Sequence, residues 1–263
     1  MNTSLLRYII VLLFLGSCIL KEDANLVLPK EEQKVYVEAY LAKGQPITVS
    51  LFESNSLDAA LSVKLLWNAE PTVTFQDTSI QLLNLFYYDP TSGKIINYAN
   101  PYLVKHQQDS IFLSITLPNG KKINSMTEVV EPIEIVDYKI EQGTISITCN
   151  QGKNNKNPFY GFFLQQFSKT DTIINMSYFN YSSQEALNQV ILQQKLGSDM
   201  DSIVAIAYRM NALNYDFQTK LKQASAANID PYQSPVKLPS NINGGAGIFT
   251  FYSSDTLRIN IKK

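Results

Sequence analysis

Charged and metal-binding side chains are scarce in this sequence of 263 residues. Charged residues make up 17% of the chain, against roughly 25% in an ordinary soluble domain, and 45% of the residues are hydrophobic, so the chain is expected to fold. A formal net charge of −1 argues against nucleic acid as a partner, because nucleic-acid-binding proteins present clustered Lys and Arg. One histidine and two cysteines leave too few ligands for a histidine-based metal site, a zinc ribbon or a disulfide framework, and no cofactor is expected.

The common enzyme motifs are also missing. His106, the single histidine, lies in a polar segment between two predicted strands, and no Gly-x-Ser-x-Gly elbow accompanies it. The glycine-rich segment 244–247 precedes a predicted strand and no lysine follows it, so a bulge or strand crossing explains it better than a phosphate-binding loop. We therefore expect a protein that is not an enzyme. A hydrolase with dispersed carboxylates stays open, and the scattered candidates for it are Asp137, Glu141, Asp199 and Asp201.

The start of the sequence has the features of a targeting segment. Arg7 precedes an apolar run from Tyr8 to Leu15, which is far shorter than the roughly 20 apolar residues of a membrane span. The tetrapeptide Leu-Gly-Ser-Cys that ends at Cys18 follows the order of a bacterial lipobox, in which the cysteine receives a diacylglycerol and becomes the first mature residue. We predict a lipoprotein signal peptide at residues 1–17 and lipidation of Cys18. The alternative is an ordinary secretory signal with an incidental cysteine.

The residues after Cys18 predict a tether that is exposed at the cell surface. Lys21, Glu22 and Asp23 resemble the export signal of surface lipoproteins of Bacteroidetes, in which a lysine is followed by acidic residues. Half of the positions from 21 to 34 are charged, a density typical of a flexible spacer. We therefore expect residues 18–34 to anchor the protein to the outer membrane through lipid, on the cell surface rather than on the periplasmic face.

From Val35 onward the hydrophobic pattern is that of antiparallel sheets. Hydrophobic residues alternate with others over 47–52 and 111–117, and the latter segment runs into a Pro-Asn-Gly turn. About seven such strands predict a β-sandwich, immunoglobulin-like or related, at residues 35–131. Trp67, the single tryptophan, is expected to be a core residue of this domain.

The pattern restarts near Glu131, which predicts a second β domain at residues 132–263. A Ser-x-x-Glu capping box at Ser182 predicts a helix near 185–196, and apolar residues three or four apart predict another near 211–226. Cys149 shares a strand face with two isoleucines and is expected to be buried and unreactive. The predicted fold is therefore mainly β, with two antiparallel β-sandwich-like domains, the second of which carries one or two α-helices. The five strands predicted in it are 133–140, 144–149, 159–167, 173–179 and 202–209.

Aromatic residues are the most suggestive candidates for ligand contact. The chain has 13 Phe, 15 Tyr and one Trp, and exposed tyrosines beside asparagines suit sugars or peptides because they offer flat apolar area with a polar tip. Alternation along the strands would direct about half of them into the core. The cluster in the second domain consists of Phe159, Tyr160, Phe162, Phe163, Phe167, Tyr178, Phe179 and Tyr181.

Short motifs near the end of the sequence are similar to those of a known lipoprotein family. Ser240-Asn241-Ile242 and Gly244-Gly245-Ala246-Gly247-Ile248-Phe249 follow the second predicted helix. With the lipobox, they resemble the uncharacterised Bacteroidetes lipoprotein family labelled domain of unknown function 4249. Val49-Ser50-Leu51 and Asn68-Ala69 extend the resemblance along the chain, although the middle is abbreviated here. The resemblance implies an outer-membrane lipoprotein, often encoded near TonB-dependent receptors, and implies no catalytic residue.

These observations predict a surface-tethered, non-enzymatic outer-membrane lipoprotein that captures a nutrient, a peptide or other oligomer, for a TonB-dependent transporter. Its expected partners are the membrane, through the N-terminal lipid, and such a transporter. The alternative is a structural or adhesive lipoprotein of the cell envelope, and the hydrolase is a third hypothesis.

Overall fold

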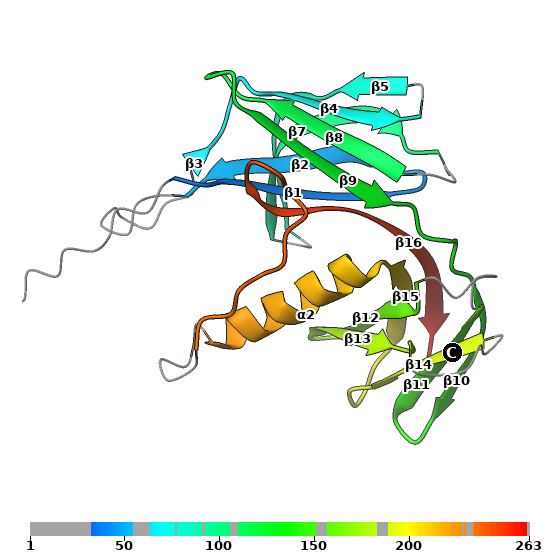
Figure 1. The fold of residues 1–263 in the computed structure, drawn as a ribbon. Coiled ribbons are helices and arrows are strands. Elements are labelled where there is room, and N and C mark those ends of the chain that lie inside the picture. The colour runs from blue at the N-terminus through cyan, green and yellow to red at the C-terminus, as the bar shows by residue number, and fades with distance from the viewer. Residues whose placement is uncertain are drawn as a thin grey trace, which may run out of the picture.

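The computed structural model describes residues 33–54, 64–76, 78–90, 93–105, 110–150, 157–182, 189–227, 229 and 234–261, and within these ranges the chain is mainly β (Figure 1). The predicted fold class is confirmed. The strands up to Glu128 are β1 Val35–Ala42, β2 Pro46–Glu53, β3 Lys64–Leu65, β4 Glu70–Phe75, β5 Thr78–Gln81, β6 Leu83–Asp89, β7 Lys94–Leu103, β8 Ser110–Thr116 and β9 Lys122–Glu128. The later elements are β10 Ile135–Glu141, β11 Thr144–Asn150, β12 Phe159–Phe167, β13 Thr172–Asn180, β14 Gln189–Lys195, β15 Ser202–Met210, α2 Ala212–Ala227 and β16 Ala246–Asn260.

One long sheet runs through both halves of the chain. Its strand order is β13-β12-β15-β16-β1-β2-β7-β6, with β3 beside β2, and two smaller sheets pack against it. The sheet β5-β4-β8-β9 covers the end that contains β1 and β2, and the sheet β10-β11-β14 covers the end that contains β12 and β15 (Figure 1). The result is two β-sandwiches, and the long sheet forms one layer of each.

Each small sheet closes a separate hydrophobic core against the long sheet. The alternation in β1 is direct evidence for this: Val37, Ala39 and Leu41 are buried in the first core, and the even-numbered residues of the strand face the other side. In β15, Ile203, Ala205 and Ala207 are buried in the second core in the same way. The face of the long sheet opposite the two cores is therefore left for other contacts.

Strand β16 joins the two halves. Its residues 246–252 pair in parallel with β1, and its residues 252–260 pair antiparallel with β15. Phe249 and Phe251 belong to the first core, and Ile259 belongs to the second. This strand of 15 residues thus belongs to both sandwiches, as the long dark-red ribbon in Figure 1 shows.

The glycine-rich segment before β16 allows its close approach to β1. Gly247 has φ +111°, a conformation that L side chains rarely adopt, and a Cβ atom there would overlap the carbonyl oxygen of Val37. A Cβ at Gly245 would lie 2.7 Å from the carbonyl oxygen of Val35. The segment leads into strand β16, as the strand-crossing interpretation requires, and not into a helix.

Helix α2 begins at a side-chain cap and packs on the free face of the long sheet. The backbone N–H of Asn214 donates to Oδ1 of Asn211, 2.9 Å away, which satisfies one unpaired amide of the first turn. Phe217 and Asn214 are its buried residues. Figure 1 shows the helix below β1 and beside β12 and β15, in the angle of the bent sheet. The helix occupies the region predicted as 211–226.

The prediction of another helix, near 185–196, is wrong for the residues of this segment that the structure describes. Residues 189–195 form strand β14, in which buried Val190 and Leu192 alternate with exposed Ile191. All seven residues pair with β11. The apolar residues of the segment fit one face of a helix as well as one face of a strand. Pairing with a distant strand decides between the two structures, and local spacing could not reveal that partner.

Two further expectations need correction. The division into 35–131 and 132–263 misses the return of residues 242–251 to the first core, because the parallel pairing of β1 with β16 joins segments far apart in the sequence.

Trp67 is 39% exposed and is not a core anchor, whereas Tyr98 is fully buried and accepts a hydrogen bond from the backbone N–H of Ala69. Within the described ranges, no helix has the length and apolar character needed to cross a membrane.

Candidate functional site

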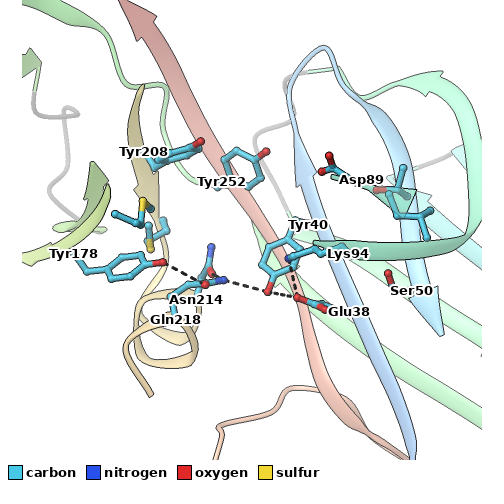
Figure 2. A pocket seen from close by; sticks show the side chains of 14 residues that line it. Glu38, Tyr40, Ser50, Asp89, Lys94, Tyr178, Tyr208, Asn214, Gln218 and Tyr252 are labelled. Carbon is cyan, nitrogen blue, oxygen red and sulfur yellow. Dashed lines mark hydrogen bonds and ion pairs between the residues drawn. The ribbon is translucent and has the colours of Figure 1, made fainter. Parts of the chain in front are cut away.

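A cavity of about 330 Å³ lies on the free face of the long sheet, where the two halves of the sheet and α2 meet (Figure 2). Four tyrosines dominate its wall, and each is half-buried. They come from β1, β13, β15 and β16, so the site exists only when both halves of the chain are folded together. The lining residues are Glu38, Tyr40, Thr48, Ser50, Asp89, Lys94, Ile96, Met176, Tyr178, Tyr208, Met210, Asn214, Gln218 and Tyr252.

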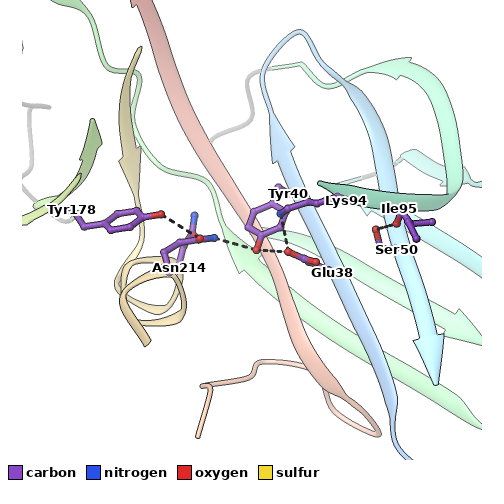
Figure 3. A network of polar contacts seen from close by, with 8 residues as sticks. Glu38, Tyr40, Ser50, Lys94, Ile95, Tyr178 and Asn214 are labelled. Atoms are coloured by element: carbon purple, nitrogen blue, oxygen red, sulfur yellow. Dashed lines mark hydrogen bonds and ion pairs between the residues drawn. The ribbon is translucent and has the colours of Figure 1, made fainter. Parts of the chain in front are cut away.

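A chain of hydrogen bonds crosses the cavity wall from β7 to β13 (Figure 3). The Lys94 ammonium and the Tyr40 hydroxyl both donate to Oε1 of Glu38, over 2.7 and 2.8 Å. Gln218 continues the chain, since its Nε2 donates to the Tyr40 hydroxyl oxygen over 3.1 Å and its Oε1 accepts from Tyr178 over 3.4 Å. These hydrogen bonds link the first half of the protein to α2 and to the second half.

The electrostatics of this wall favour neutral, protonated tyrosines. Burial, the nearby Glu38 carboxylate and its hydrogen bond raise the pKa of Tyr40 well above its ordinary value. Burial also raises the pKa of Tyr178, Tyr208 and Tyr252. The Lys94 ammonium lies 3.6 Å from the centre of the Tyr40 ring, a cation–π contact that adds to its ion pair with Glu38. None of these hydroxyls is therefore prepared to act as a base near neutral pH.

Several polar atoms in the wall have no partner among the described residues. The hydroxyls of Tyr208 and Tyr252 form no hydrogen bond there, and Figure 2 shows both rings beside the cavity. Asn214 is 3% exposed, and its Oδ1 accepts from Gln218, but within the described part of the chain its Nδ2 donor has no acceptor. Both hydrogen bonds to Glu38 end on Oε1, which leaves Oε2 as an acceptor. These atoms can bind a ligand's polar groups.

The candidate carboxylates from the sequence do not gather at this cavity. Asp137 and Glu141 lie exposed on β10, and Asp199 and Asp201 lie in the turn before β15. Over the ranges that the structure describes, no group of three or more His, Cys, Asp or Glu side chains could hold a metal ion. The arrangement at the cavity suits binding through rings, amides and hydroxyls.

Sequence reasoning found one of the four cavity tyrosines. Tyr178 belongs to the predicted aromatic cluster, whereas Tyr160 and Phe162 of that cluster are buried in the second core. Tyr40, Tyr208 and Tyr252 were missed, although β1 alternates so that Glu38 and Tyr40 share its face away from the core. Cys18, Lys21, Glu22, Asp23 and His106 lie outside the described residues.

Cys149 is buried in the second core, and we expect its thiol to be unreactive in the folded protein. Burial, with a smaller contribution from Asp255, raises its pKa to about 12, so the reactive thiolate is nearly absent at pH 7 to 9. In a Cys18→Ala variant of the full chain, where Cys149 is the single thiol, iodoacetamide should label the protein only after urea unfolding. Labelling of the native protein that increases between pH 7 and 9, as for a free thiol, would contradict this prediction.

Comparison with known families and structures gives a family and no activity. A family model described as "Domain of unknown function (DUF4249)" matches residues 21–258. A search of curated proteins returned no match. Among solved structures, the FN1-FN3 domains of chicken CNTN1 align with 11% sequence identity and a TM-score of 0.29, over 88% of this chain and 67% of that one.

Proposed function

This chain belongs to the DUF4249 family, whose description assigns no function, and we propose from its own residues that it is a non-enzymatic binding lipoprotein of the outer membrane. It captures a nutrient, a peptide or other oligomer, and passes it to a TonB-dependent transporter. The observation that carries this proposal is the cavity, with its half-buried tyrosines and with polar atoms that have no partner among the described residues. A rigid β framework holds these groups in place before a ligand arrives, which lowers the entropic cost of binding.

The N-terminal sequence supports the location. Acyl chains on Cys18 would hold the protein stably in the membrane, because each buried methylene contributes about 0.8 kcal/mol and lipoproteins carry more than one chain. The charged spacer at 21–34 would let the folded part reach a neighbouring transporter, with Lys21, Glu22 and Asp23 as its surface export signal. Anchoring both proteins in one membrane raises their effective concentration and so favours a weak contact.

One observation favours the structural or adhesive alternative. The edge strand β6 exposes five large hydrophobic side chains, and such an edge readily pairs with another protein. They are Leu83, Leu85, Phe86, Tyr87 and Tyr88. An envelope component could use this edge for assembly, and the transporter could also contact it.

A deletion strain separates these functions. We expect it to grow poorly on a particular peptide or other oligomeric nutrient, and the wild-type gene should restore growth. A Cys18→Ala variant should move from the membrane to the soluble fraction and fail to restore growth, because the lipid anchor is lost. The measurements are growth rates on single nutrients and immunoblots of membrane and soluble fractions.

The matched control is Cys149→Ala, which removes the other cysteine and should stay in the membrane. A deletion that alters attachment or envelope integrity without any nutrient defect would favour the structural alternative. A Cys18→Ala protein that remains in the membrane would contradict the anchor.

A further inference from the structure

We infer that the cavity, taken as the binding site of the capture function proposed above, holds a neutral, hydroxyl-rich ring of the kind that makes up an oligosaccharide. This inference rests on the proposed function and specifies the ligand of the same site. It follows from four properties of the lining: its charges, its hydrogen-bonding atoms, its apolar surface and its strand pairing.

The charged groups of the cavity are already partnered. Lys94, the single cation among the described lining residues, donates to Glu38 over 2.7 Å and lies on the Tyr40 ring. Asp89 also has an interaction within the protein. An anionic ligand would find no unpaired cation in the part of the lining that the structure describes, and burying a charge without a partner is costly. The cavity therefore favours a neutral ligand.

The available polar atoms suit hydroxyl groups. Asn214 Nδ2 can only donate and Glu38 Oε2 can only accept, whereas the hydroxyls of Tyr208 and Tyr252 can do both. A ligand hydroxyl can also donate and accept, so one kind of group satisfies the whole set. Asn214 is 3% exposed overall and lines the cavity, so a ligand in the cavity can supply the acceptor that its Nδ2 lacks among the described residues.

The apolar part of the lining offers faces for a ring. Tyr208 and Tyr252 are in edge contact, with ring centres 5.5 Å apart and planes at 62°. Met176, Met210 and Ile96 add apolar surface nearby. A sugar ring has an apolar face of C–H groups and a rim of hydroxyls, so it can lie against a tyrosine while its rim reaches the polar atoms. A purely apolar ligand would leave those polar atoms desolvated and unpaired.

Strand pairing disfavours an extended peptide at the base of the cavity. The strand segments that carry the cavity tyrosines are already paired: Tyr40 lies opposite Thr250, Tyr208 lies between Gly161 and Ser254, and Tyr252 lies opposite Ala42 and Met210. A peptide that binds by strand addition needs a free edge. The volume of about 330 Å³ is near the lower limit of ligand pockets, roughly 300 to 1,000 Å³. One or two rings of a longer chain would fill it.

Calorimetric titration of the purified full-length protein tests the inference. The probes are the neutral maltotetraose, cellotetraose and chitotetraose, the anionic tetragalacturonate, and the peptide tetra-alanine. We expect a neutral oligosaccharide to bind, and Tyr252→Ala to raise its Kd by about tenfold or more. Tyr252→Phe, which keeps the ring, should raise Kd by about threefold to tenfold through the lost hydroxyl, even if the alanine variant folds poorly.

Two more variants sharpen the test. Asn214→Asp replaces the Nδ2 donor with an acceptor in the first turn of α2, where a carboxylate is tolerated, and should raise Kd by about tenfold. Tyr138→Ala, at an exposed tyrosine of β10 outside the cavity, is the matched control and should leave Kd unchanged.

The outcomes distinguish this inference from the function it rests on. Binding of tetra-alanine or tetragalacturonate that is weakened by Tyr252→Ala would overturn the neutral-sugar inference and leave nutrient capture intact. Absence of binding by all three neutral sugars, or binding that Tyr252→Ala and Asn214→Asp do not change, would also overturn it. The growth phenotype of the deletion strain tests capture independently of these titrations.

Discussion

A Gly247→Ala substitution should unfold much of the protein by separating β1 from β16. The alanine Cβ would overlap the Val37 carbonyl oxygen, and φ +111° is unfavourable for any residue with a Cβ. The parallel pairing of seven residues would be lost, and Phe249 and Phe251 would leave the first core. We expect a loss of about 4 kcal/mol or more in the free energy of unfolding, measured by urea denaturation with far-UV circular dichroism.

The matched control is Gly120→Ala. Gly120 also has a positive φ, +79°, but a Cβ there would meet no atom within 4 Å. We expect this variant to lose about 1 kcal/mol, the cost of the backbone conformation alone. Equal losses in the two variants would show that the close approach of Gly247 to Val37 contributes nothing to stability.

An Arg209→Ala substitution should destabilise the second core by a similar amount. Arg209 is 2% exposed, and its guanidinium donates to the carbonyl oxygens of Pro132 and Asn150 over 2.8 and 2.7 Å. It also lies 5.4 Å from the centre of the Tyr160 ring. Removal deletes both hydrogen bonds and leaves a cavity in place of a large buried side chain, and we expect a loss of about 3 to 5 kcal/mol in the free energy of unfolding. The ion pair with Glu131 adds little, since it spans 3.9 Å and Glu131 is partly exposed.

A second readout locates this damage. Cys149 lies in the same core, so iodoacetamide labelling without urea should increase in Arg209→Ala on a Cys18→Ala background. Arg258→Ala, which removes an exposed arginine of β16, is the control and should change stability by less than about 0.5 kcal/mol. Arg209→Ala protein with wild-type stability and an unlabelled Cys149 would contradict the role assigned to this guanidinium.

Local sequence patterns predicted most of the described strands. The boundaries of β12 coincide with the predicted Phe159–Phe167, and burial of Cys149 followed from its two isoleucine neighbours on one strand face. These features depend on contacts between residues two or four apart, which the sequence displays directly. The prediction for 189–195 was wrong because the decisive contact, pairing with β11, is not local.

The cavity was hidden from the sequence for the same reason. Tyr40 and Tyr252 lie in neighbouring strands, but only the register of β1 against β16, in which Ala42 pairs with Tyr252, brings them to one site. A second register, that of β15 against β16, places Tyr208 at the same cavity. Outward-facing tyrosines could be identified from the alternation in each strand, whereas the order of the strands required the structure.

The parallel pairing of β1 with β16 also sets the order of events during synthesis. A ribosome delivers β1 long before β16, so the first core stays incomplete until residues 246–252 have been made. Pairings between such distant segments form slowly, because closing a long loop costs entropy before any contact repays it. Until then, the hydrophobic side chains of β1 lack the cover that Phe249 and Phe251 give them in the first core. A chaperone that shields the core-facing side of β1 would be needed for longer than in a protein whose first core is built from consecutive strands.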